Sequence, residues 1–497
     1  MKNHCDSHKR TFPICSGFST LNSQFAMSLC LCASVVVFLA ASALARPNIV
    51  FIYTDDQAPW ALGLSGNEQA HTPHMDRLFK GGAYLVNSFT TTPVCSPSRA
   101  SLMTSRYGTE VGITDWIHPR DEPELGLDPN YITWPEVLHA AGYKTALIGK
   151  WHLGVPDEFS PTNNGFDKFV GFREGGTKVK DPTLEVDGKP QQMEGLTVDI
   201  LADHAIQFIR DNRAAPFLLC WHTRAPHSPW KPVRDEDWSP YAGLDPIIPN
   251  PDYPDLDVGK VEDVMMQYLA STTGVDRNVG RLLDTLEELE LAHNTVVIFT
   301  SDHGYNVGHN GIWHKGNGHW ITKSVRDYKW NDPRKQRPNQ FDRSLRVPPA
   351  ARWPGVIQPG TVVTKTVSNL DWYPTIVAMA EAKRPAEMKI SGPEIAPQLQ
   401  SEDAQWDNDF YAQFSQHHYI ETHMRSYRTP EWKLIRDFLR EGKDELYDLK
   451  SDPEETTNLI ASDDLRALSA KRELNAKLLA KMKEIDDRVF EGKEALH

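Results

Sequence analysis

Residues 48–56 have the sequence NIVFIYTDD, and this stretch decides the fold. Its first seven residues form an apolar run rich in β-branched and aromatic side chains, which is typical of a strand buried on both faces of a parallel sheet. Two carboxylates, Asp55 and Asp56, follow where the run ends. Ligands of open α/β sheets bind at the carboxyl ends of strands, so the stretch predicts a central strand and one part of a functional site.

Three further apolar runs end in ionisable residues in the same way. They are residues 145–149 before Lys150-Trp151-His152, residues 216–221 before the histidine-containing segment 222–227, and residues 295–300 before Asp302-His303. Polar, helix-compatible stretches separate them, notably 196–210 and 261–291, whose apolar residues recur at helical spacing. This alternation predicts an α/β fold, a large mixed, mostly parallel sheet sandwiched by helices, with one shared site.

The two ends of the chain differ from its middle. Residues 1–45 combine a basic start, an apolar stretch and Ala43-Leu44-Ala45, which predicts a cleaved export signal. A membrane anchor is the alternative, but the apolar stretch is shorter than the roughly 20 residues of a spanning helix. Residues 46–385 are the predicted catalytic domain. Residues 386–497 are predicted to form a smaller α+β subdomain, with a short antiparallel sheet that includes strands at 432–438 and 445–449, and a terminal helix over 461–489.

Charge and cysteine content narrow the class of protein. The 497 residues carry 53 Lys+Arg against 67 Asp+Glu, and the net charge of −14 argues against a nucleic-acid binder. Four of the six cysteines lie in the predicted signal, which leaves Cys95 and Cys220 and no disulfide framework. The sequence also contains no Asn-x-Ser/Thr acceptor. We therefore expect a bacterial protein, exported to the periplasm or beyond, without stable membrane insertion.

The strand ends bring together the side chains of a candidate metal site. Asp55, Asp56, Asp302 and His303 offer three carboxylates and one imidazole. This oxygen-rich set suits Ca²⁺ or Mg²⁺ better than a structural zinc, although the imidazole also suits Mn²⁺ and Zn²⁺. For the Asp-Asp pair alone, a solvated turn is an equally good interpretation.

Residues 95–99, CSPSR, open a predicted helix. Pro97 suits a first helical turn, which places Cys95 at or just before the N-terminus, where the dipole favours negative charge. Arg99 can return a cation to the same end. A buried structural thiol is the ordinary interpretation of a lone cysteine. The whole string, continued by Leu102-Met103-Thr104, favours a functional one.

This string resembles the motif for conversion of cysteine to Cα-formylglycine in the type I sulfatase family, within the alkaline phosphatase-like superfamily. The resemblance covers essentially the whole chain after residue 45, with segments at 47–50, 72–78, 149–154, 301–304, 446–449, 452–453 and 458–459 in the family's order. It implies an alkaline phosphatase-like fold, a sulfuric ester hydrolase, and a formylglycine-generating enzyme that acts on Cys95. It also implies one divalent cation, most often Ca²⁺, bound by Asp55, Asp56, Asp302, His303 and residue 95.

The resemblance further implies roles for the surrounding groups. One oxygen of the hydrated aldehyde attacks sulfur and the other expels sulfate, which a serine could not do. Lys150 would hold a sulfate oxygen, and His152, on the same face if the backbone is extended, would assist hemiacetal breakdown. His227 would protonate the leaving oxygen. Lys315 would bind sulfate and Arg99 would orient residue 95.

Two positions depart from the family's usual pattern. Ser105 stands where glycine is usual, so we expect conversion of Cys95 at altered efficiency, and His303 stands where many relatives have asparagine. Of the histidines near Lys315, a supporting or exposed position is at least as good an interpretation as catalysis. They are His309, His314 and His319.

The substrate is indicated only by charge and aromatic content. Residues 323–346 carry a local basic excess, which predicts a pocket mouth for the sulfates or uronates of an anionic polysaccharide, with a solvated insertion as the equal alternative. Trp60, Trp116, Trp230 and Trp320 could stack on sugars, but packing is the safer interpretation. The leading prediction is a sulfatase of sulfated glycans. A phosphonate monoester or phosphodiester hydrolase and an inactive glycan-binding relative are the alternatives.

Overall fold

The computed structural model describes residues 46–399 and 406–491. The predicted export signal, residues 1–45, lies outside the described residues. Among the helices of the two described ranges, none has the length and apolar character needed to cross a membrane.

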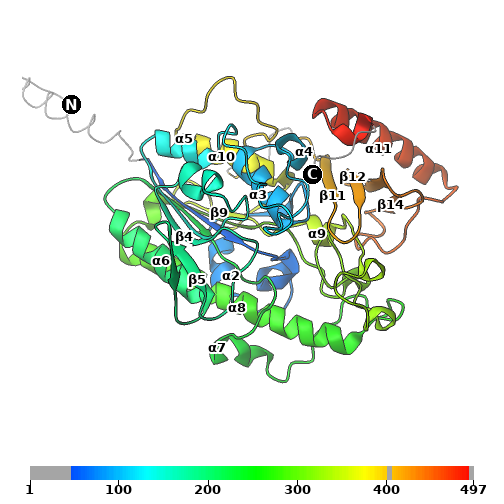
Figure 1. Cartoon of the computed structure of the whole chain (residues 1–497), viewed down its shortest axis with the longest axis horizontal. Coiled ribbons are helices and arrows are strands. Elements are labelled where there is room, and N and C mark those ends of the chain that lie inside the picture. Colours follow the sequence, from blue (N-terminus) through cyan, green and yellow to red (C-terminus); the bar gives the residue numbers. More distant parts are fainter. Residues whose placement is uncertain (1–45, 400–405, 492–497) are drawn as a thin grey trace, which may run out of the picture. The chain divides into compact units, whose positions relative to one another are not determined.

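A mixed sheet forms the centre of the described chain (Figure 1). Its strands are β1 (Asn48–Thr54), β2 (Ala83–Phe89), β3 (Lys144–Lys150), β4 (Lys168–Phe172), β5 (Thr183–Val186), β6 (Lys189–Gln192), β7 (Phe217–His222), β8 (Thr295–Ser301), β9 (Ala350–Arg352) and β10 (Thr361–Ser368). Within the described residues their order is β10-β2-β9-β8-β1-β7-β3-β4-β5-β6. Strands β8, β1, β7, β3 and β4 run parallel to one another, and β9, β5 and β6 pair antiparallel. The predicted mixed, mostly parallel sheet is confirmed.

Strand β1 lies in the interior of this sheet with every residue buried. Its register aligns Tyr53 with His222 of β7 and Thr54 with Ser301 of β8. The carboxyl ends of these strands therefore lie level with one another. The four apolar runs of the sequence form the adjacent strands β8, β1, β7 and β3, so the chemically active segments that follow them leave the same edge of the sheet.

Helices cover both faces of the sheet (Figure 1). One layer contains α2 (Pro73–Lys80), α6 (Thr197–Asn212) and α8 (Val258–Glu288), and the other contains α3 (Cys95–Thr104), α5 (Trp134–Ala140) and α10 (Trp372–Met379). Short helices are α4 (Gly108–Val111), α7 (Asp235–Trp238) and α9 (Asp342–Leu345). Along β1, Phe51 packs into the α3 layer and Ile52 into the α8 layer, because successive side chains point to opposite faces. Leu282 and Leu286, on the apolar face of α8, pack in the same cluster as Ile52 of the sheet.

A second, antiparallel sheet follows in the C-terminal region. Its strands are β11 (Phe410–Gln416), β12 (Thr422–Arg428), β13 (Trp432–Asp437) and β14 (Glu445–Asp448), and α11 (Leu465–Glu484) packs on it (Figure 1). The predicted strands at 432–438 and 445–449 are present. The predicted helix over 461–489 is too long at both ends. Asp464 caps α11 by accepting the N–H groups of Arg466 and Ala467, which fixes the start of the helix. The domain boundary at residue 385 stays a prediction.

Candidate active site

The carboxylates of the predicted metal site lie together at the ends of β1 and β8. Asp55, Asp56, Asp302 and His303 are completely buried. The chain turns at Asp56, whose φ is +70°, and this turn is held by two hydrogen bonds. The Asp56 N–H donates to Asp302 Oδ1 at 3.1 Å, and the Tyr268 hydroxyl donates to the Asp56 carbonyl at 2.7 Å. Adjacent carboxylates can therefore face one point, as the sequence predicted.

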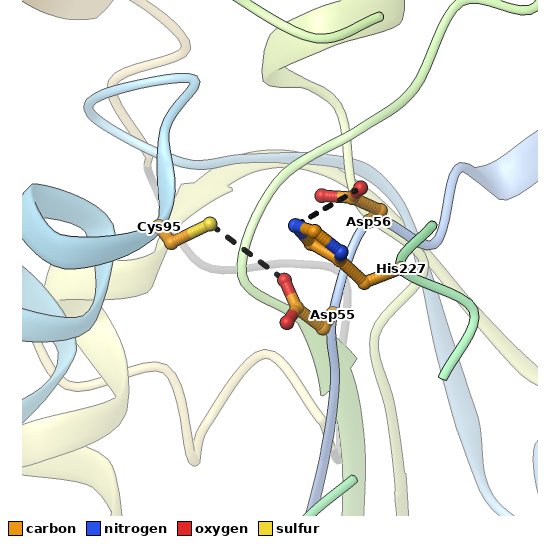
Figure 2. A group of neighbouring side chains, drawn as sticks. All are labelled: Asp55, Asp56, Cys95 and His227. Atoms are coloured by element: carbon orange, nitrogen blue, oxygen red, sulfur yellow. Dashed lines mark hydrogen bonds and ion pairs between the residues drawn. The ribbon is translucent and has the colours of Figure 1, made fainter. Parts of the chain in front are cut away.

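Cys95 reaches this point from the opposite side, at the first residue of α3 (Figure 2). Its Sγ lies 3.7 Å from Asp55 Oδ1, 3.4 Å from His303 Nε2 and 3.0 Å from Lys315 Nζ. The predicted helix N-terminus at Cys95 is confirmed. Cys220, the other cysteine outside the predicted signal, is a buried residue of β7 with no part in this cluster.

Each carboxylate of the cluster is paired with a cation. Lys150 Nζ lies 2.7 Å from Asp55 Oδ2, and Lys315 Nζ lies 2.6 Å from Asp56 Oδ1. Arg99 donates to Asp302 Oδ2 from Nε at 3.2 Å and from Nη2 at 2.9 Å. These cations are almost fully buried, so their charges act in a medium that screens them weakly.

The electrostatics favour negative charge at residue 95. Burial opposes ionisation of the Cys95 thiol, but the positive charges of Lys150, Lys315 and His303 outweigh it and hold the pKa of the thiol well below its ordinary value. Burial raises the pKa of the Asp302 carboxyl, and the neighbouring Asp55 carboxylate adds to the rise. The site therefore needs more positive charge to keep all its carboxylates ionised.

The donor atoms meet the requirements of a divalent cation. One group of donors, all within 4.8 Å of one another, comprises Asp55, Asp56, Cys95 and His227, and another comprises Asp55, Cys95, Asp302 and His303. Asp56 Oδ2 is buried and accepts no hydrogen bond from the described residues, as expected for an oxygen that faces a cation. The predicted ligands thus converge, and the cluster could hold a metal ion.

His227 approaches from the loop after β7 (Figure 2). Its Nε2 lies 4.0 Å from Asp56 Oδ2, and its Nδ1 donates to the Ser228 carbonyl at 2.6 Å. The side chain is 22% exposed, whereas the carboxylates below it are completely buried. His227 therefore lies where a ligand would enter, with Nε2 directed inward.

Sequence reasoning missed the residue that fixes this loop. Arg224 is buried and donates to the carbonyls of His227 at 2.9 Å, Ser228 at 2.6 Å and Pro229 at 3.1 Å, and to that of Thr177 at 2.9 Å. A planar guanidinium can bond several carbonyls at once. The sequence shows an arginine two residues after the strand. Its partners could not be predicted, because every residue has the same backbone carbonyl.

The extended backbone assumed for His152 is wrong, and its catalytic role stays a prediction. His152 has a φ of +59°, so the backbone after Lys150 is not extended. Its Nε2 instead bonds the Ile117 carbonyl at 3.0 Å. Burial and then Lys150 lower the pKa of the His152 imidazole to about 4, and its charge interacts with that of Cys95, so the side chain does lie in the cluster.

Ser105 caps the other end of α3 in a left-handed conformation, with a φ of 52°. This conformation explains why glycine would suit the position. The serine side chain compensates, because Oγ donates to the Leu370 carbonyl at 2.8 Å and accepts the Gly392 N–H at 3.1 Å.

The remaining sequence candidates are mostly engaged within the protein. His309, His314 and His319 are buried, which agrees with supporting positions. Within 323–346, ion pairs join Arg326 to Asp257, Arg334 to Asp332, Arg337 to Glu445 and Arg343 to Glu454, and Arg346 donates to the Val86 carbonyl. Most of the basic side chains in 323–346 therefore bond to groups within the protein. This favours the interpretation as a solvated insertion over that as a site that binds an anionic polysaccharide. Trp230 is buried, and Trp60, Trp116 and Trp320 are half-buried.

Comparison with known proteins places this geometry in a family. Residues 47–382 match the family model described as sulfatase, and residues 327–484 match the model described as N-sulphoglucosamine sulphohydrolase, C-terminal. An N-acetylglucosamine-6-O-sulfatase of Bacteroides thetaiotaomicron is 26% identical over 500 aligned residues, covering 84% of this chain and 83% of the relative. A steryl-sulfatase of Mus musculus is 28% identical over 482, covering 77% and 69%.

A solved structure gives the same result. It contains a protein in complex with its substrate D-glucosamine-2-N,6-O-disulfate, and it aligns with 90% of this chain and 100% of its own at a TM-score of 0.76 and 25% identity. The sulfatase model alone spans more than half of the chain. The chain therefore belongs to the type I sulfatase family and is a sulfuric ester hydrolase.

Proposed function

We propose that the enzyme removes sulfate from a sulfated oligosaccharide or polysaccharide, with Cys95 converted to formylglycine and Ca²⁺ as the metal. The observation that carries this proposal is the convergence on Cys95 Sγ of Lys315 Nζ at 3.0 Å, His303 Nε2 at 3.4 Å and Asp55 Oδ1 at 3.7 Å. Two relatives support a glycan substrate. One is the structure in complex with D-glucosamine-2-N,6-O-disulfate, and the other is the N-acetylglucosamine-6-O-sulfatase.

The protein's own groups divide the work as follows. Lys150 and Lys315 bind the sulfate oxygens on either side of residue 95. Arg99 bonds the Asp302 carboxylate and so keeps Asp302 in position. These buried cations stabilise charge that grows during sulfuryl transfer, and such fixed groups contribute several kcal/mol in a dry site. His227 donates a proton to the leaving oxygen, and His152 takes and returns the proton of the residue 95 hydroxyl groups.

Asp55, Asp56, Asp302, His303 and residue 95 would hold the divalent cation. A bound Ca²⁺ would supply the positive charge that the buried carboxylates need and would favour the ionised form of the residue 95 oxygen. Formylglycine would supply two geminal oxygens where cysteine supplies one sulfur. The formylglycine-generating enzyme is the maturation partner in this proposal, and residues 1–45 direct export.

The proposal is tested with protein whose residue 95 has been checked by peptide mass. Initial rates are measured on defined sulfated oligosaccharides, 4-nitrophenyl sulfate, a steroid sulfate and an aryl phosphonate monoester, with and without a Ca²⁺ chelator. We expect the highest kcat/KM on a sulfated oligosaccharide and loss of activity after chelation that Ca²⁺ restores. A higher kcat/KM on steroid sulfate would overturn the glycan assignment, and a higher one on phosphonate would overturn the sulfate-ester preference.

A further inference from the structure

Four aromatic side chains from three distant segments, Trp116, Trp313, Trp330 and Tyr419, lie side by side beyond the catalytic cluster. We call them the aromatic rim. The ring centroids of Trp116 and Tyr419 are 6.1 Å apart, and those of Trp313 and Trp330 are 5.1 Å apart. The indole of Trp330 interacts with the Tyr419 hydroxyl, which joins the two pairs.

Two members of the rim expose much of their rings. Trp330 and Tyr419 are each 39% exposed, although most large aromatic side chains of the described chain are buried. A single exposed apolar side chain needs no explanation, but two in contact form a surface available to a ligand.

The aromatic rim adjoins both histidines of the proposed reaction. On one side, the Trp330 ring lies 5.5 Å from that of His314, which precedes Lys315 and lies close enough to His227 for their charges to interact. On the other side, Trp116 is followed by Ile117, whose carbonyl bonds His152 at 3.0 Å and whose N–H donates to Ser96 Oγ at 3.0 Å. The rim therefore borders the side from which His227 meets the leaving group.

A hydrogen-bond network holds the loop that carries Tyr419. Glu122 accepts from His417 Nε2 at 2.8 Å and from His418 Nε2 at 3.1 Å. Asp115 Oδ2 accepts the N–H groups of the same two histidines, at 3.1 and 3.2 Å. The His418 ring also packs on Trp116, with centroids 4.2 Å apart. These contacts fasten the loop to segment 115–122, so the rim is ordered before a ligand arrives.

We propose that the aromatic rim binds the saccharide part of the leaving group, with Trp330 and Tyr419 as the residues that select it. This proposal rests on the proposed function. A pyranose ring has a face of C–H groups that packs on the electron-rich face of an aromatic ring, and the hydroxyls at its edge remain free for polar contacts. The sulfate itself is bound by the buried cations. The rim therefore contributes to binding of the saccharide and not to binding of the sulfate group.

The test compares Trp330→Ala and Tyr419→Ala with the wild-type enzyme, through kcat/KM on the best sulfated oligosaccharide and through the inhibition constant of inorganic sulfate, which fills only the sulfate site. For each variant we expect about a fivefold lower kcat/KM on the oligosaccharide, chiefly through KM, because an aromatic contact of this kind contributes about 1 kcal/mol. The inhibition constant of inorganic sulfate stays within about twofold of the wild type, since no rim residue contacts the sulfate. Phe490→Ala, which removes a 43% exposed aromatic side chain outside the rim, is the matched control and changes neither quantity.

Each other outcome overturns a defined statement. If inhibition by inorganic sulfate weakened as much as activity on the oligosaccharide, the aromatic side chains would support the catalytic cluster. Unchanged KM values would mean that the rim binds no sugar. If the wild-type enzyme turned over 4-nitrophenyl or steroid sulfate but no oligosaccharide, the glycan substrate itself would be wrong. Because this result needs only the wild-type enzyme, it is distinguished from a failure of the aromatic-rim proposal.

Discussion

Lys150 and Lys433 are both fully buried lysines bonded to buried carboxylates, but only Lys150 lies beside Cys95. We predict that Lys150→Met lowers kcat by about 10²–10³, the usual effect of removing one fixed group that stabilises transition-state charge. The measurement is steady-state kinetics on 4-nitrophenyl sulfate, with residue 95 checked in each preparation.

Lys433→Met separates this effect from a loss of stability. Lys433 Nζ bonds Asp342 at 2.8 Å and Glu455 at 2.7 Å in the C-terminal region. Removing one partner of a buried ion pair costs about 3–5 kcal/mol, so both variants unfold at lower denaturant concentration. Below the unfolding transition, Lys433→Met keeps the wild-type kcat. A Lys150→Met enzyme with unchanged kcat would contradict the proposed sulfate contact.

Ser105 shows how two small effects compete at one residue. Its left-handed backbone costs roughly 1 kcal/mol, which Ser105→Gly would relieve. The same change removes two side-chain hydrogen bonds of about 1 kcal/mol each and adds the backbone entropy of glycine to the unfolded state. We therefore predict that Ser105→Gly destabilises the fold by about 1 kcal/mol, and Ser105→Ala, which keeps the strain and loses the bonds, by more. Urea midpoints test this order, and a more stable glycine variant would contradict it.

At the scale of an element, the loop after β7 depends on Arg224. Since Arg224 bonds three carbonyls around His227, we predict that Arg224→Gln displaces the imidazole and lowers kcat about tenfold on substrates with a poorly acidic leaving alcohol, whose departure needs the proton. Rates on 4-nitrophenyl sulfate, whose leaving group needs no proton, change much less. Arg224→Lys restores part of the lost rate. Equal losses on both kinds of substrate would point to general misfolding of the site.

The elements that were predicted have local sequence patterns, whereas those that were missed depend on contacts with other parts of the chain. Strand β1 was predicted because its apolar run and terminal carboxylates are local features. Strand β11 was missed because Gln413, Ser415 and Gln416 interrupt the apolar pattern, yet all three are buried, and Gln413 hydrogen-bonds the Thr109 hydroxyl of a distant segment at 2.8 Å. The His152 turn and the Arg224 contacts likewise depend on backbone groups, which have the same chemistry in every sequence. The candidate metal-binding residues were named from the sequence and lie together in the structure, whereas their supporting contacts were not predicted.

At the scale of the whole molecule, Asp342 joins helix α9 to the C-terminal sheet. It lies in α9 and accepts hydrogen bonds from Arg428 of β12 at 3.0 Å and Lys433 of β13 at 2.8 Å. Burial opposes ionisation of this carboxyl, but the two cations outweigh it and hold its pKa below the ordinary value of 3.8. A carboxyl with a lowered folded pKa stabilises the fold at pH values above about 4 and loses that contribution as the pH falls through the folded pKa.

We predict that Asp342→Asn destabilises the protein at pH 7 by about 3 kcal/mol, because it leaves two buried cations without their carboxylate. The free-energy difference from the wild type then shrinks as the pH falls below about 4, because the unfolded wild type takes up a proton at this carboxyl while the folded wild type keeps it ionised, and the variant has no such group. Glu455 titrates in a neighbouring pH range, because burial raises its pKa to about 7 and the Asp342 carboxylate adds to the rise, so both proteins carry Glu455→Gln in this measurement. Urea unfolding at several pH values measures the effect, with Asp463→Asn at an exposed position as the control. A difference that stayed constant down to pH 3 would mean that the Asp342 ion pairs do not stabilise the contact between α9 and the C-terminal sheet.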